Sequence, residues 1–309
     1  MSGALLVENK LHRAYWRKIT GVETGLAYVG STTSGYDAPA EGFSFANALD
    51  DNGGTSFMIQ SFGKQVDATL TFPSALTFNG FAVYGHNLTS NQGLKIKYST
   101  SDTGTTNFNE FKATPYTSNE YKPSDNSFKP FGALFSSTIT GVRRLRFETI
   151  AWNSKNFITI ISAGMWVSSG INITAPFVPP SFAPHEVSMK RNNKGNHLLS
   201  DVRKVPQKLN IKLTRFSEDD LYTTTDTAQN TIINGLNTTH PFIDYMGHFM
   251  SRHPFFLMYQ QGNASDSNSV RISDQQKIYF CNISKQLDQP KFSSPTLLDW
   301  SIKCLGYVE

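Results

Sequence analysis

The side chains that most often act in catalysis or hold metal ions are few and scattered in this sequence. Its seven histidines are spread over most of the chain: His12, His86, His185, His197, His240, His248 and His253. His248 and His253 are five residues apart, whereas two zinc ligands on one helix face are about four residues apart. Cys281 and Cys304 are too few for a thiolate zinc site or a disulfide framework. We interpret the histidines as surface or capping residues and the cysteines as buried small hydrophobes.

The acidic residues and the glycine-rich turns also lack the spacing of known chemical sites. The run Asp50-Asp51-Asn52-Gly53-Gly54 has oxygen ligands and glycine but no bidentate glutamate at the distance that calcium loops need, so a turn is favoured. Gly63-Lys64-Gln65 lacks the residues of a phosphate loop, and no Gly-x-Ser-x-Gly elbow occurs. Ser217-Glu218-Asp219-Asp220 is typical of the start of a helix. We therefore expect no catalytic residue, no metal ligand and no cofactor.

One basic stretch lies in the second half of the chain, and it contains Lys190, Arg191, Lys194, Arg203, Lys204 and Lys208. It holds no aromatic side chain on which a base could stack. The net charge of +4 is also small for a protein that grips a phosphate backbone. A solvated or partner-facing strip is the favoured interpretation, and contact with nucleic acid would be indirect.

The composition is that of a folded chain with an unusually uncharged surface. The chain has 309 residues, of which 39% are hydrophobic and 13% aromatic, which excludes a disordered protein. Charged residues make up 17%, against about 25% in an average domain, so partners cover part of the surface or it is rich in Ser, Thr, Asn and Gln. No signal peptide is recognisable, because Glu8 interrupts the apolar start.

The first half of the chain alternates between apolar and polar residues, as short β-strands do. Leu94, Ile96 and Tyr98 alternate with polar residues, and Phe157 to Val167 has the pattern of a buried strand or strand pair. Similar runs occupy residues 68–72, where Pro73 is expected to end the strand, and residues 76–84 and 144–148. Turn-forming residues separate the runs. Residues 1–175 are therefore predicted to form a jelly-roll β-sandwich.

A proline-rich segment separates this region from a second one. Four of the 14 prolines fall in residues 176–184, which we expect to be an extended, semi-rigid linker. Beyond it, strands are predicted at residues 208–215, 255–259, 276–283 and 296–308. Apolar residues spaced by three and four predict an amphipathic helix over residues 240–252. Residues 185–309 are thus predicted to form a second β-sandwich flanked by an α-helix.

Several short segments resemble a family of viral proteins. Phe81 to Leu88, which ends in Gly-His-Asn-Leu, and Gly93 to Ser99 resemble the galactose-binding-like jelly rolls of tailed-bacteriophage structural proteins. Residues 144–148 and 164–167 resemble the closing strands of that domain, and residues 254–257 and 300–304 resemble tail-tube and distal-tail proteins. His86 and Asn87 are expected to cap a strand end, with Asn87 in a left-handed turn.

The resemblance implies a non-enzymatic virion component, a distal-tail or baseplate protein of a phage tail. It would form a ring, hexameric in the resembling proteins, that connects the tail tube to baseplate parts, receptor-binding fibres or a host glycan. Cyclic closure needs two different interfaces on each subunit, which suits a chain with few charges.

Two alternatives belong to other functional classes. The first is a carbohydrate-binding adhesin or fibre module, which needs an exposed aromatic platform beside polar loops. Trp152 is the best candidate platform, although a core position is the more common place for a tryptophan. The second is a polysaccharide-active enzyme, which would need two carboxyl groups facing each other in a cleft.

Overall fold

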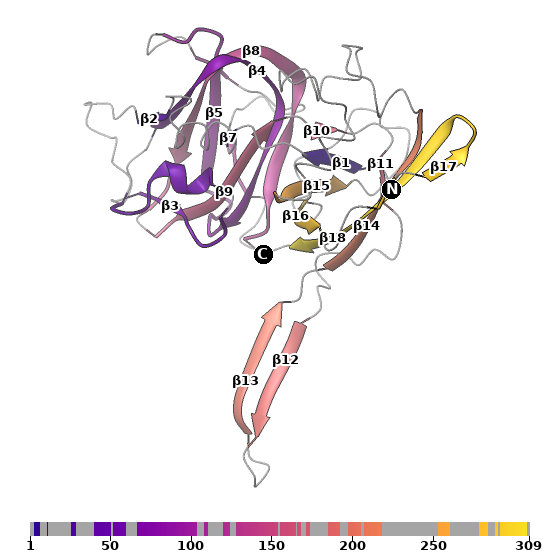
Figure 1. Cartoon of the computed structure of the whole chain (residues 1–309). Coiled ribbons are helices and arrows are strands. Elements are labelled where there is room, and N and C mark those ends of the chain that lie inside the picture. Colours follow the sequence, from indigo (N-terminus) through magenta and orange to yellow (C-terminus); the bar gives the residue numbers. More distant parts are fainter. Residues whose placement is uncertain are drawn as a thin grey trace.

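The fold is mainly β, as the sequence predicts, in a computed structural model of the chain (Figure 1). The structure describes residues 3–6, 11, 26–28, 40–50, 52–59, 67–103, 108–110, 120–123, 128–153, 155–164, 166–167, 171–173, 185–191, 197–204, 207–217, 253–259, 278–283, 288–289 and 291–307. In these residues, eighteen strands form three antiparallel sheets, and Phe45–Ala48 form the short 3-10 helix η1.

The first sheet, here called the sandwich sheet, holds most of the first half of the chain. Its strand order is β3 (Phe57–Met58), β9 (Phe157–Gly164), β4 (Asp67–His86), β8 (Phe131–Ile150), β5 (Gly93–Ser99) and β6 (Asn109–Glu110). In addition, β2 (Leu26–Tyr28) pairs with β4 and β7 (Glu120–Tyr121) pairs with β5.

Strands β4 and β8 are long and bend together, which folds the sandwich sheet into two layers. Early in β4, Leu70 pairs with Leu145, and late in β4, Val83 pairs with Phe131. Between these two regions the register shifts several times, from Thr71 to Gly80. Figure 1 shows both strands arching over the top of the molecule. The prediction that a strand ends at Pro73 is wrong, because β4 continues through it with an irregular register at the bend.

Aromatic rings fill the space between the two layers. The ring of Phe45, on η1, lies 5.1 Å from that of Phe57 and 5.3 Å from that of Phe147. The ring of Trp152 lies 5.4 Å from that of Phe57, and all four side chains are buried. Burying a large apolar side chain contributes about 1.5–3 kcal/mol, so this core stabilises the bend of β4 and β8.

The second sheet combines strands from both ends of the chain. Its order is β10 (Trp166–Val167), β1 (Gly3–Leu6), β15 (Phe255–Tyr259), β16 (Ile278–Ile283), β18 (Leu297–Tyr307), β14 (Gln207–Ser217) and β11 (Ile171–Ile173), with β17 (Lys291–Ser294) paired to β18. The strands predicted at residues 208–215, 255–259, 276–283 and 296–308 are confirmed. Ile211 pairs with Ile302 and Leu209 with Cys304, so the predicted apolar positions share one face.

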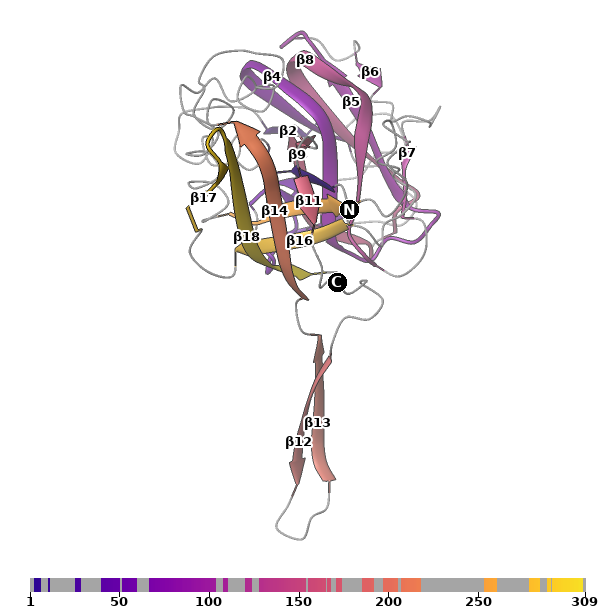
Figure 2. The same cartoon turned by 90° about the vertical axis from the view of Figure 1, so that its right-hand side faces the viewer.

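The third sheet is a hairpin of β12 (His185–Arg191) and β13 (His197–Lys204), here called the arm. In both views it projects away from the other two sheets (Figures 1 and 2).

The sheets do not divide at residue 175. Strands β1, β10 and β11 precede that residue, yet they pair with each other or with strands that follow residue 207. Period-two patterns carry no information about such distant pairing, so the sequence could not show it. The predicted linker at residues 176–184, the predicted helix at 240–252 and residues 218–220 of the predicted helix start lie outside the described residues.

The sandwich sheet packs on the second sheet through the face of β4 and β9 that points away from the sandwich core. On this face, Ala82 and Ile160 alternate with core residues and are nevertheless fully buried. The ring of Tyr84 stacks on that of Phe280 with centroids 4.3 Å apart and planes at 12°. Phe280 in turn contacts Phe256 at 5.2 Å. An aromatic stack therefore joins the two sheets.

A double-mutant cycle measures this contact. We expect Tyr84→Leu and Phe280→Leu together to lower the free energy of unfolding by about 1 kcal/mol less than the sum of the single changes, because the stacked pair is lost only once. Urea denaturation supplies the four values. Phe292→Leu is the matched control, since Phe292 is 61% exposed and its change should add to that of Tyr84→Leu. Strict additivity for Tyr84 and Phe280 would contradict the contact.

Candidate functional site

Three connecting segments meet at one end of the sandwich, here called the loop end. They are residues 87–92 between β4 and β5, residues 128–130 before β8, and residues 151–156 between β8 and β9, of which the structure describes all but residue 154. Because β4 and β8 fold over the core, both ends of β8 reach this place. Phe131 pairs there with Val83, and Ile150 pairs with Gly93.

His86 closes the end of β4 as a neutral side chain. Its Nε2 lies 2.7 Å from the carbonyl oxygen of Lys129, and the backbone N–H of Leu88 donates to its Nδ1 at 3.1 Å. Nδ1 is thus an acceptor, which leaves the proton on Nε2 for donation to Lys129. The side chain is only 3% exposed, and this burial lowers the pKa of His86 to about 4, although the bond to Lys129 opposes the shift. The predicted capping role of His86 is confirmed.

Asn87 does not take the left-handed conformation predicted for it. The residue with positive φ in the Gly-His-Asn-Leu motif is Gly85, at φ +64°. A Cβ atom at Gly85 would lie 2.7 Å from Thr159, so glycine fits there for two reasons. Asn87 instead links two segments. Its Nδ2 donates to the carbonyl oxygen of Lys155 at 2.6 Å, and its Oδ1 accepts from the backbone N–H of Phe157 at 2.9 Å.

Two buried amide side chains join the neighbouring turns. Gln92 donates to Asn156 at 2.8 Å, and Asn156 donates back to Gln92 at 2.9 Å. Gln92 also accepts from the backbone N–H of Thr89, and Asn156 accepts from that of Asn153. Each amide therefore closes its own turn while it holds the other. The sequence analysis did not identify this pair, because nothing in the sequence shows that residues 92 and 156 meet.

Trp152 is a core residue and not an exposed platform. It is 1% exposed, and its Nε1 donates to the carbonyl oxygen of Gly93 at 2.8 Å. This excludes Trp152 as the exposed platform and confirms the core position that the sequence favoured.

The exposed aromatic side chain of the loop end is that of Phe128. It is 46% exposed and has φ +58°, a conformation that is rare for a bulky residue. Its neighbour Lys129 is the residue bonded to His86, which places Phe128 beside the end of β4. Asn91 and Lys155 are also exposed in the adjoining turns. One feature of the sequence could have identified Phe128. It is an isolated phenylalanine between a Ser-Asp-Asn-Ser run and Pro130, where no alternating strand pattern accounts for an apolar residue.

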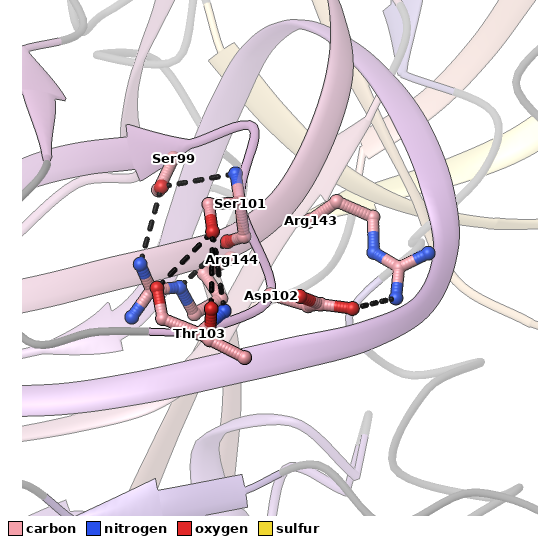
Figure 3. A network of polar contacts seen from close by, with 6 residues as sticks. All are labelled: Ser99, Ser101, Asp102, Thr103, Arg143 and Arg144. Atoms are coloured by element: carbon pink, nitrogen blue, oxygen red, sulfur yellow. Dashed lines mark hydrogen bonds and ion pairs between the residues drawn. The ribbon is translucent and has the colours of Figure 1, made fainter.

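A second polar cluster lies at the far end of β5, away from the loop end (Figure 3). Arg143 forms an ion pair with Asp102 at 2.8 Å. Arg144 donates to the carbonyl oxygen of Ser101 at 2.7 Å and to the hydroxyl of Ser99 at 3.2 Å. These contacts tie the turn after β5 to β8, so we interpret the cluster as structural.

The outward face of β4, β8 and β5 brings two buried acids together. Asp67 pairs with Glu148 across β4 and β8, on the face opposite the core. The Nζ atom of Lys97 lies 2.7 Å from Glu148, which is therefore engaged in an ion pair. Phe108 lies over the neighbouring guanidinium groups, 4.0 Å from that of Arg146. Lys97, Arg144 and Arg146 share this face with the two acids, so positive charges lie beside the carboxyl groups.

The remaining candidates from the sequence have structural roles in the described residues. Asp50 accepts from the backbone N–H of Asn52 and from the hydroxyl of Thr55, which confirms the predicted turn. Cys281 and Cys304 are buried and free, and burial together with the neighbouring thiol raises the pKa of Cys281. Within the described ranges no three His, Cys, Asp or Glu side chains gather as metal ligands would, and no helix is long and apolar enough to cross a membrane.

Comparison with known proteins finds partial structural likeness only. No protein-family model and no curated protein sequence match the chain. A Ruminococcus gnavus GH29 fucosidase in complex with fucose is 18% identical over 40% of this chain, with a TM-score of 0.31. The match spans 23% of the fucosidase.

Two smaller proteins overlap over most of their own length. A chitosan-binding module from a Paenibacillus sp. IK-5 chitosanase/glucanase is 11% identical and has a TM-score of 0.33, over 45% of this chain and 93% of the module. A CBM32 module from a Clostridium perfringens family 31 glycoside hydrolase is 11% identical with a TM-score of 0.34, over 45% and 94%. Overlaps of this size assign neither a family nor a ligand to this chain. The phage-tail assignment, its virion localisation and its ring of subunits stay predictions.

The protonation of His86 should make stability depend on pH. Its folded pKa of about 4 lies below its ordinary value of 6.5, so protons favour the unfolded chain between these values. The contribution of neutral His86 to the free energy of unfolding is fully present above pH 6.5. It is lost as the pH falls towards 4, and a shift of this size corresponds to about 3 kcal/mol.

Urea unfolding of wild type and His86→Gln measures this effect, because the variant cannot titrate at this position. The stability advantage of the wild type over the variant should shrink between pH 7 and pH 4. Two parallel stability curves would contradict the assignment of His86 as a buried neutral group.

Removing one of the paired amides should weaken the loop end strongly. Asn156→Ala removes the acceptor of the Gln92 side-chain amide and of the backbone N–H of Asn153, which we expect to cost about 2–3 kcal/mol of unfolding free energy. Asn91→Ala is the control, since Asn91 is exposed in the neighbouring turn and should change stability by less than about 0.5 kcal/mol. Equal small losses in both variants would show that the amide pair does not hold the turns.

Proposed function

We propose that the loop end of the sandwich binds a carbohydrate. The observation that carries this proposal is the exposed ring of Phe128, held in a strained conformation beside turns that buried amides brace. A sugar ring has an apolar C–H face and a rim of hydroxyl groups. An exposed aromatic ring suits the first, and polar side chains beside it suit the second.

The strain at Phe128 supports a role for its ring. A non-glycine residue in the left-handed region costs about 1–3 kcal/mol, whereas glycine adopts it freely. Such strain persists where the surroundings fix the backbone, and it is concentrated in binding and catalytic sites. Here the bond from His86 to Lys129 and the pairing of Phe131 with Val83 fix the chain on the carboxyl side of Phe128. A fold that needed only a turn at this position would be more stable with glycine.

The turns around Phe128 are preorganised for binding. Asn87, Gln92 and Asn156 use their amide groups to bind one another and the backbone, so they hold the turns rigid. Asn91 and Lys155 are exposed in the same turns and can reach sugar hydroxyl groups. A rigid site loses little conformational entropy when a ligand binds.

The residues of the loop end favour the binding of a carbohydrate over its hydrolysis. The segments 85–93, 128–131 and 151–157 contain no aspartate and no glutamate. Hydrolysis of a glycosidic bond needs a pair of carboxyl groups on either side of that bond. The predicted role in a phage tail tip would be compatible with this site, because a host glycan is one of the partners that such a role implies.

A glycan array of neutral and acidic saccharides, followed by calorimetry with the strongest binder, tests the proposal. Phe128→Ala should weaken binding at least tenfold, because the stacking surface is lost. Phe128→Gly should do the same while the free energy of unfolding stays constant or rises by up to about 1 kcal/mol, because the strain is relieved. Phe292→Ala removes an exposed ring on the second sheet and should leave affinity within twofold.

Two results would contradict the proposed function or its site. If the wild-type protein binds no saccharide on the array, the proposed function is wrong. If it binds one and Phe128→Ala has the same affinity, the site is elsewhere on the molecule.

A further inference from the structure

In the part of the chain that the structure describes, the arm is a two-stranded sheet, and no further strand pairs with its two outer edges. Within the described residues, β12 and β13 pair only with each other, and neither joins the other two sheets. Both views show the hairpin extending away from the rest of the ribbons (Figures 1 and 2). An isolated two-stranded hairpin is marginally stable in water, and three or more strands are needed for independent stability. Each open edge also presents backbone N–H and C=O groups that can pair with another strand.

The sequence of β12 is complementary to itself in the antiparallel direction. The strand has seven residues, and Ser188 is its centre. If two copies pair about Ser188, Val187 falls opposite Met189, and Glu186 falls opposite Lys190. The two-fold symmetry of such a pair produces both contacts twice. The pairing therefore has two apolar cross-strand pairs inside two pairs of opposite charge, an arrangement that stabilises antiparallel strands.

The other edge of the arm is less suited to self-pairing. In β13, Asp201 falls opposite Arg203 only when two copies pair about Val202. In that register only residues 200–204 are paired, so the first three residues of the strand, 197–199, have no partner. Pairing through β12 covers the whole strand.

We propose that the arm binds a second copy of this chain, β12 against β12, to form a four-stranded antiparallel sheet in the order β13–β12–β12–β13. The interface is isologous, since the same strand edge is used by both partners. It converts two marginal hairpins into a sheet of four strands. The interaction does not depend on the carbohydrate proposal.

Charge swaps in the full-length chain test this pairing. Sedimentation velocity should show that the wild type of 34.4 kDa associates into a species of twice that mass as concentration rises. Glu186→Lys places two lysines opposite each other, and Lys190→Glu places two glutamates opposite each other. Each single variant should dissociate at least tenfold more readily, because like charges meet twice in the dimer. The double variant Glu186→Lys/Lys190→Glu should restore association.

Mixing the two single variants provides the sharpest readout. One carries only positive charge at these two positions and the other only negative charge, so they should form a mixed dimer that native mass spectrometry detects. Asp201→Lys is the matched control, because it makes the same change of charge on β13 and should leave the dimer intact.

Three results would overturn the proposal. The first is a wild type that stays monomeric at high concentration, which would leave a different protein as the partner of the arm. The second is association that the single charge swaps do not weaken. The third is a double variant that stays dissociated together with single variants that form no mixed dimer.

Discussion

The pairing of β4 with β8 around one aromatic core is the constraint on which the rest of this structure depends. Each strand crosses from one layer of the sandwich to the other, so a single antiparallel pair builds both layers. The same bend brings the two ends of β8 to one place. Phe128 and Lys155 thereby become exposed residues of one end of the sandwich although the whole of β8 separates them in the sequence. The position of the loop end is thus a consequence of the packing of Phe45, Phe57 and Phe147.

Strain and bracing balance each other at the loop end. The left-handed conformation of Phe128 costs about 1–3 kcal/mol. Each hydrogen bond that fixes the surrounding turns contributes about 1 kcal/mol, and the structure has several, from His86, Asn87 and the amide pair of Gln92 and Asn156. The turns therefore keep a conformation that an unbraced chain would leave. If the loop end binds a carbohydrate, as we propose, the ring of Phe128 is already in position before the ligand arrives.

Local patterns in the sequence predicted local structure well and distant pairing poorly. The alternation of Leu94, Ile96 and Tyr98 identified β5, and similar patterns identified β14, β15, β16 and β18 of the second sheet, because period two depends on adjacent residues. The pairing of β1 with β15 left no such trace, since nothing local to residues 3–6 specifies residues 256–259.

Single side chains were harder to place than strands. Trp152 could be core or surface until the fold put it against Phe57, and the left-handed residue proved to be Gly85 and not Asn87. Phe128 was not predicted as a candidate site residue, because it was identified from its backbone strain and its exposure, which are properties of the folded chain.

A crystal structure of the full-length chain with its best saccharide from the array is the most direct test of this account. We expect electron density for a sugar ring stacked on Phe128, with its hydroxyl groups bonded to the turns at residues 87–92 and 151–156. Density for the sugar on the second sheet or on the outward face of β8, with the ring of Phe128 left uncovered, would contradict it.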